Sequence, residues 1–170
     1  AYPTSHTVGN VHMDGVRNRA GATAFDVLPV GNTYQYTDMP FPAFDEGGAL
    51  RLDAAGGDYD PFTIAARGVA PLEVPAAEFA MVRGEPLVLT WAAPGLADVA
   101  TVHVKVDISH HGGSRGKIEC DAPDTGRLEI PAELSDHLLD LGAAGFPVVQ
   151  LSRRHVGATE IAVGRVELTV

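Results

Sequence analysis

The sequence predicts an all-β fold, an antiparallel β-sandwich with one short helix. Residues 100–109 alternate apolar and polar side chains, which is typical of a strand with one buried face. The rest of the chain repeats this pattern in short runs that are broken by its 19 Gly and 12 Pro residues. Such runs favour antiparallel over parallel sheets. With 170 residues, the chain is long enough to form one domain with a full hydrophobic core.

The N-terminal half is predicted to begin as an extended arm and to continue as short strands. Residues 1–23 are polar and irregular, so the β-sandwich domain is assigned to residues 24–170. The acidic, glycine-rich stretch 53–60 is typical of a turn within a hairpin. Two prolines within 69–75 favour a crossover between sheets, and residues 75–85 offer a sub-boundary within the domain. Strands are expected at residues 25–30, 33–37, 49–54 and 62–66.

The C-terminal half is predicted to supply most of the core. Alternation directs the apolar residues of the 100–109 strand inward and directs His103 and Lys105 toward water. Trp91 is expected to be the central aromatic of this core. Further strands are expected at residues 87–91, 118–120, 128–130, 147–153 and 161–170. The inward-facing residues are predicted to be Leu87, Leu89, Trp91, Val102, Val104, Val106 and Ile108.

The helix is predicted at residues 131–141. Leu134, Leu138 and Leu141 recur at the spacing of one helical face. Pro131 suits the first helical position, because its fixed φ fits a helix and its missing N–H would have no partner there. The segment therefore reads as a single short helix in an otherwise β domain.

Charge and composition exclude several classes of partner. The chain has 22 Asp and Glu against 12 Lys and Arg, a net charge of −10, which repels the phosphate backbone of nucleic acids. No stretch approaches the roughly 20 apolar residues of a membrane helix, so no transmembrane segment is expected. With one Cys, no internal disulfide can form.

Acidic turns supply the first candidate metal ligands. Asp53, Asp58 and Asp60 surround two glycines whose carbonyls could complete an oxygen cage for calcium. Asp121 and Asp124 could do the same at another corner. The alternative is an ordinary turn, because Asp and Gly are the usual turn residues.

Histidines supply the second set of candidate ligands. His110 and His111 lie at a glycine-rich tip, and His103 lies on the strand before it. Imidazole nitrogens suit zinc or copper. The alternative is that these histidines are solvated and bind no metal, in which case the chain has no cofactor.

Two other patterns suggest chemistry or recognition. Residues 112–116 match the G-x-S-x-G motif, with Ser114 as nucleophile and His155 as base of a small serine hydrolase. That motif normally follows a parallel strand, whereas Ser114 lies at a predicted hairpin tip, which favours a flexible turn.

Five aromatic residues of the N-terminal half lie close together in the sequence. They could form a carbohydrate-binding surface, or they could pack at the edge of the core: Tyr34, Tyr36, Phe41, Phe44 and Tyr59.

The C-terminal half resembles the immunoglobulin-like β-sandwich domains of secreted bacterial proteins and lipoproteins. The resemblance is carried by the Trp strand 87–91, the strand 102–106 and the Cys strand with its Asp-Thr-Gly turn at 118–131. It implies a periplasmic, outer-surface or extracellular location and no catalytic residues. The expected function is a non-catalytic module for binding, adhesion or assembly, and the alternative is a divalent-metal or carbohydrate binding module. An exposed edge strand would allow self-association.

Overall fold

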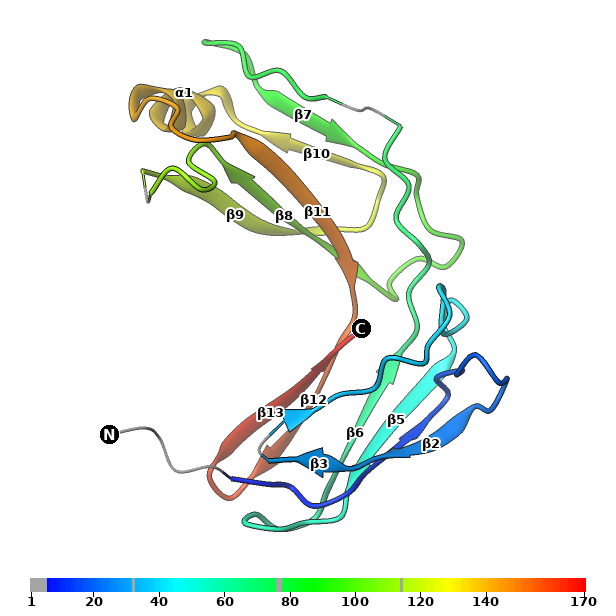
Figure 1. The fold of residues 1–170 in the computed structure, drawn as a ribbon. Coiled ribbons are helices and arrows are strands. Elements are labelled where there is room, and N and C mark those ends of the chain that lie inside the picture. Colours follow the sequence, from blue (N-terminus) through cyan, green and yellow to red (C-terminus); the bar gives the residue numbers. More distant parts are fainter. Residues whose placement is uncertain (1–5, 32, 76–77, 114) are drawn as a thin grey trace. The chain divides into compact units, whose positions relative to one another are not determined.

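The computed structural model describes residues 6–31, 33–75, 78–113 and 115–170 and confirms the all-β class. Within these residues there are thirteen strands, all paired antiparallel, and one helix. The chain divides into two compact units, which we call unit 1 (Ala1–Ala70 and His155–Val170) and unit 2 (Pro71–Arg154). Unit 2 is therefore inserted between two segments of unit 1 (Figure 1).

Unit 1 is built around a four-stranded antiparallel sheet in the order β2-β1-β5-β6. The hairpin of β5 and β6 closes through the acidic turn, as predicted. Two further hairpins, β3 with β4 and β12 with β13, complete the unit. Its strands are β1 (Val11–Asp14), β2 (Ala24–Val27), β3 (Pro29–Val30), β4 (Thr33–Tyr34), β5 (Ala49–Ala54), β6 (Phe62–Arg67), β12 (Val156–Ile161) and β13 (Gly164–Thr169).

The core of unit 1 contains a cluster of four buried residues, Val16, Ala43, Leu50 and Ala66, and side chains of the first and last segments pack around them. Further buried apolar residues of the unit are Val11, Val27, Ala54, Ile64 and Val69. Gly157 of β12 lies so close to β6 that a Cβ on it would stand 2.0 Å from the Ala65 carbonyl oxygen. Close backbone packing therefore holds the C-terminal hairpin against the sheet.

Unit 2 consists of two sheets and the helix. One sheet has the order β11-β8-β9 and the other pairs β10 with β7. In Figure 1 the β7–β10 pair forms one layer and the three-stranded sheet the other. The elements are β7 (Leu87–Thr90), β8 (Thr101–Asp107), β9 (Lys117–Pro123), β10 (Arg127–Ile130), α1 (Ala132–Asp140) and β11 (Val148–Arg154).

The core of unit 2 joins the inner faces of both sheets, as the alternation predicts. The β8 side chains of Val102 and Val104 are fully buried, and Leu89 of β7 is equally inaccessible. Trp91 is 4% exposed and belongs to the same cluster. Because the cluster takes side chains from both layers, burial of apolar surface holds the two sheets together.

A buried ion pair lies at one end of this core. Arg153 of β11 and Asp124 of the β9–β10 turn have side chains that are 3% and 2% exposed. The Arg153 guanidinium also donates to the carbonyl oxygens of Pro71 and Ala92, at 2.8 and 2.7 Å. The Trp91 indole N–H donates to Asp124 Oδ1 at 2.7 Å. The network ties the first, middle and last segments of unit 2 together.

The helix α1 matches the predicted position but buries a different face. Pro131 is the residue before its first turn, and Leu138 is buried as expected. Leu134 and Leu141 are 49% and 47% exposed, however, and the second buried residue is Ser135. A helix this short on the rim of a small sandwich buries a narrow stripe, so only part of the leucine face has a partner.

Three boundaries differ from the sequence interpretation. Within the stretch assigned to an arm, residues 11–14 form β1, which lies between two other strands of the unit 1 sheet. The predicted single strand 161–170 is instead the second half of a hairpin, because the chain turns at Ala162 and Val163. The units separate after Ala70 and again after Arg154, rather than at 75–85.

Candidate functional site

A pocket of about 540 Å³ opens in unit 2 and reaches its core. The strand β8 contributes Val106 and Ile108, and β11 contributes Val149 and Leu151. Leu87 of β7 lines the opposite side. Leu87, Val106 and Ile108 are each 2% exposed, so the floor of the pocket is the hydrophobic core itself.

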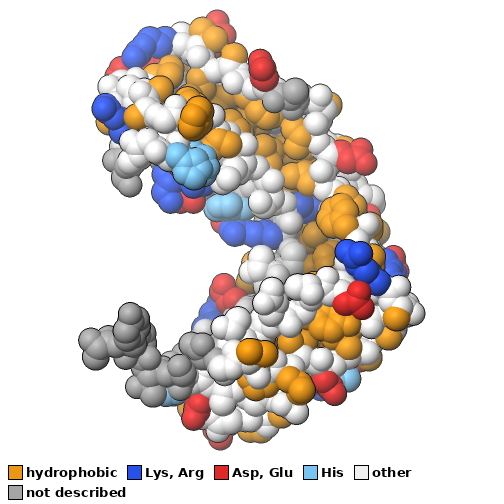
Figure 2. All heavy atoms as spheres, viewed as in Figure 1, with side chains coloured by type: hydrophobic (Ala, Val, Ile, Leu, Met, Phe, Trp, Pro, Cys, Tyr) orange, Lys and Arg blue, Asp and Glu red, His pale blue; other side chains and the backbone are white. Residues whose placement is uncertain are grey.

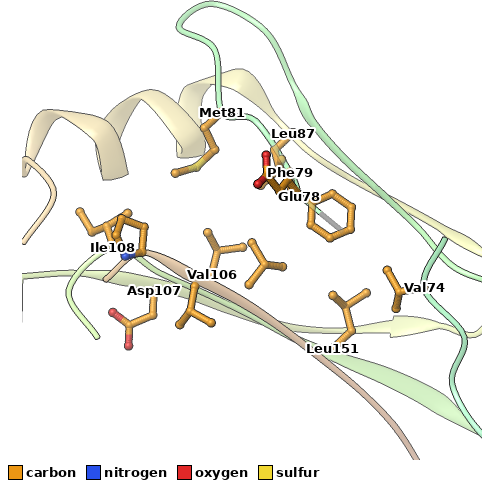
Figure 3. A pocket seen from close by; sticks show the side chains of 12 residues that line it. Val74, Glu78, Phe79, Met81, Leu87, Val106, Asp107, Ile108 and Leu151 are labelled. Carbon is orange, nitrogen blue, oxygen red and sulfur yellow. The ribbon is translucent and has the colours of Figure 1, made fainter. Parts of the chain in front are cut away.

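The segment before β7 forms the remaining wall of the pocket. Val74, Phe79 and Met81 line it from residues that belong to no helix or strand. Phe79 and Met81 pack on the core but are only partly buried. Figure 3 shows their side chains across the pocket from Val106 and Ile108. Methionine and phenylalanine at an open wall can adapt to the shape of a ligand.

The pocket carries two carboxylates, and they point in different directions. Figure 3 shows the Glu78 carboxylate beside Phe79 and Leu87, whereas the Asp107 carboxylate points away from the apolar side chains. Asp107 accepts hydrogen bonds from the backbone N–H and the hydroxyl of Ser109, at 2.8 and 3.1 Å. Its Oδ2 lies 3.3 Å from Lys105 Nζ. These partners, the Ser109 N–H foremost, lower the pKa of Asp107.

The volume and the lining residues of the pocket indicate the kind of ligand that it can bind. Small-molecule sites in proteins are concave, span roughly 300–1,000 Å³, and are mostly apolar with a few polar groups. The unit 2 pocket falls within this size range, and its lining combines apolar side chains on the floor and walls with the carboxylates of Glu78 and Asp107. Figure 2 shows hydrophobic side chains gathered on the visible face of this unit.

Two of the three aspartates of the predicted calcium site, Asp53 and Asp58, have separate protein partners. Asp53 lies on β5, where Arg51 Nε and Nη2 donate to its two oxygens at 2.7 Å and the Thr63 hydroxyl donates at 2.5 Å. Asp58 accepts the backbone N–H of Thr7 at 2.6 Å. Asp60 is exposed in the same turn. Hydrogen bonds from Arg51 and Thr63 lower the pKa of Asp53 to about 2.

The alternative calcium corner is also occupied by protein groups. Asp124 is buried against Arg153, and Asp121 accepts from Arg154 Nη2 at 2.5 Å. Asp121 also lies 3.0 Å from His103 Nδ1, directly across from it in the β8–β9 ladder. Glu119 is farther from this imidazole, at 3.9 Å from Nε2. His103 is therefore part of a row of polar and charged side chains on the outer face of the sheet.

The other histidines lie at the tip that follows β8. The rings of His110 and His111 are 4.1 Å apart, and His111 has a positive φ of 61°. Among the described residues, no group of three or more His, Cys, Asp or Glu side chains is arranged to hold a metal ion. Ser114, the candidate nucleophile, lies outside the described residues. Asp53, Asp58 and Asp60 belong to unit 1, whereas His103, His110 and His111 belong to unit 2.

Two tyrosines of the predicted carbohydrate surface, Tyr34 and Tyr36, have partners within unit 1. The Tyr34 hydroxyl donates to the Gly9 carbonyl at 2.7 Å, and the Tyr36 ring stacks on Phe25 with centroids 4.0 Å apart. Both also line a second apolar pocket of about 330 Å³. Phe41 is the exception, because it is 88% exposed.

The residues that form the unit 2 pocket were not identified as a site from the sequence. Val106, Ile108 and Leu87 were predicted as core, and residues 74–81 have no periodicity that would mark them as a wall. Comparison with known proteins finds neither a family model nor a curated protein that matches the chain. No helix in the described part of the chain has the length and apolar character needed to cross a membrane.

Proposed function

We propose that the chain is a non-catalytic binding module of a bacterial envelope or secreted protein, and that unit 2 is an immunoglobulin-like sandwich whose pocket holds the ligand. The observation that carries the proposal is the pocket of about 540 Å³ that opens onto the core. Its apolar walls would gain free energy from a ligand that replaces water there. The resemblance of the C-terminal half to secreted immunoglobulin-like domains supports the location.

The polar residues of both units support binding rather than catalysis. Charged side chains on the sheet surfaces pair with each other, as Arg51 does with Asp53 and Arg154 with Asp121. Such surface pairs contribute little to stability and leave the pocket to provide recognition. Assembly through an edge strand is compatible with the same proposal, since β11 and β9 are the outer strands of their sheet.

The proposal is tested with the uncharged apolar dye N-phenyl-1-naphthylamine, whose fluorescence rises when it leaves water. Val149→Trp places a large ring in the pocket, and Val88→Trp is its matched control. Val88 lies on β7, in the other sheet of unit 2; it is 37% exposed and does not line the pocket. Far-ultraviolet circular dichroism establishes that both variants keep their strand content.

We expect saturable binding of the dye by the native chain and by Val88→Trp, and at least about tenfold weaker binding by Val149→Trp. A tenfold loss corresponds to about 1.4 kcal/mol, less than the burial of one large apolar side chain contributes. Equal binding by all three proteins, or no binding by the native chain, would contradict the proposal.

A further inference from the structure

We propose that the unit 2 pocket selects an apolar ligand that carries a cationic group, and that Glu78 receives the cation. This inference rests on the proposed binding function and adds the chemical class of the ligand. An alkyl or aromatic body would lie against Val106, Ile108 and Val149. An ammonium or guanidinium group would lie at the carboxylate of Glu78, on the wall that Val74, Phe79 and Met81 also line.

Glu78 is the charged group that the pocket offers to a ligand. The other carboxylate of the lining, Asp107, is bound by Ser109 and lies beside Lys105. Figure 3 shows it directed away from the apolar side chains, whereas Glu78 lies on the wall with Phe79. A ligand in the pocket therefore encounters the charge of Glu78 next to the apolar surface.

The cationic side chains of unit 2 do not supply a counter-charge at this wall. Among the described lining residues of the pocket there is no Lys, Arg or His. Three arginines elsewhere in the unit are paired with acidic partners, Arg83 with Asp140, Arg153 with Asp124 and Arg154 with Asp121.

Charge complementarity then decides which apolar ligand fits. A carboxylate at the edge of an apolar surface attracts a cation and repels an anion more strongly than it would in open water, because the local dielectric constant is lower. The net charge of −10 acts in the same direction over a longer range. An uncharged ligand gains only the apolar contacts, and an anionic ligand of the same size is disfavoured.

The test compares three ligands with the same alkyl chain and different head groups: n-octylamine, n-octanol and n-octanoate. At pH 7 these are a cation, a neutral molecule and an anion. Each displaces N-phenyl-1-naphthylamine from the native chain, and the dissociation constants follow from the competition curves. Measurements at low and at high salt separate the local contact from the long-range charge, which salt screens.

Two charge-removing variants locate the effect. Glu78→Gln keeps the shape of the side chain and removes its charge. Glu73→Gln is the matched control, because Glu73 is exposed in the same segment and does not line the pocket. Both variants change the net charge by the same amount, so a difference between them reports position alone.

We expect n-octylamine to bind about three- to fivefold more tightly than n-octanol, as a partly exposed ion pair provides, and n-octanoate to bind most weakly. Glu78→Gln should remove the preference for the amine over the alcohol, and Glu73→Gln should keep it. Equal binding of the three ligands, or a preference that survives Glu78→Gln, would overturn the inference while leaving the binding function intact. If none of the three ligands displaces the dye and Val149→Trp still binds the dye, both the cation preference and the proposed binding function of the pocket would be overturned.

Discussion

Arg153 and Asp124 form a buried ion pair, with Arg153 Nε donating to Asp124 Oδ2 at 2.5 Å and Nη2 donating to Oδ1 at 3.1 Å. The two residues are far apart in sequence, and the remaining guanidinium donors bind carbonyl oxygens of two further segments. The guanidinium nitrogens of Arg153 and the carboxylate oxygens of Asp124 therefore all have hydrogen-bond partners within the protein. Such a pair costs much free energy when one member is removed, because the other stays buried without its counter-charge.

We predict that Asp124→Asn lowers the free energy of unfolding of unit 2 by about 3–5 kcal/mol. Urea unfolding followed by fluorescence of Trp91 measures this, because Trp91 is the only tryptophan in the chain and donates to Asp124. The control is Asp140→Asn, which removes the exposed pair with Arg83 and should cost less than about 1 kcal/mol. Similar losses in the two variants would contradict this account of the core.

Gly157 is predicted to be intolerant of a side chain. In Gly157→Ala the new methyl group would meet the Ala65 carbonyl oxygen at 2.0 Å, and the shift needed to relieve the clash should cost about 1–3 kcal/mol. Faster amide hydrogen exchange in β6 and β12 would report the loss. The control is Ala158→Ser, at the next and exposed position, which should leave the exchange rates of both strands unchanged. If amide exchange in β6 and β12 of Gly157→Ala stayed as slow as in the native chain, the hairpin would not pack as described.

The low pKa of Asp53 predicts a stability change in acid. Because the pKa falls from its usual 3.8 to about 2 in the folded chain, the ionised group adds stability that is present above pH 3.8 and is lost as the pH falls through about 2. Thr63→Val removes one donor and should raise the pKa of Asp53, while Arg51 keeps it below 3.8. A carboxyl NMR titration measures the pKa, with Thr169→Val as control. An unchanged value in Thr63→Val would refute the contribution of the hydroxyl.

His12 is predicted to titrate above its usual pKa of 6.5. Its Nδ1 lies 2.6 Å from Asp26 Oδ1, and this hydrogen bond, followed by the charges of Asp14, Asp26 and Asp53, raises the pKa. The imidazolium therefore adds stability that is fully present below pH 6.5 and is lost as the pH rises through the folded pKa. Asp26→Asn should lower the pKa in an imidazole NMR titration, and Asp45→Asn, whose partner is Arg17, should not. A pKa at or below 6.5 in the native chain would contradict the geometry.

The strands with strict alternation could be predicted from the sequence, and the reason is visible in β8. Val102, Val104 and Val106 are buried at 2% exposure or less, and His103 lies on the other face. The strand β1 was missed because its alternation lasts only four residues, Val11 to Asp14, before Gly15. The turn at Ala162 and Val163 was missed because residues 161–163 are all apolar and carry no Asn-Gly or Asp-Gly signal.

The candidate site could be predicted only in part. Its floor comes from alternating strands, so Val106 and Ile108 were identified as core residues. Its other wall comes from Val74, Glu78, Phe79 and Met81, which follow no regular period. Tertiary packing on that core places Phe79 and Met81. The partnership of Arg153 with Asp124 likewise depends on how β11 folds back beside β8, which no local pattern reveals.

The most direct measurement of the central claim is a methyl NMR titration of the native chain with N-phenyl-1-naphthylamine. The binding account predicts saturable shifts for the methyl groups of Val106, Ile108, Val149 and Leu151, which line the unit 2 pocket, with little change at Leu50 in the core of unit 1. Shifts confined to unit 1, or none at saturating dye, would contradict the assignment of the pocket as the binding site.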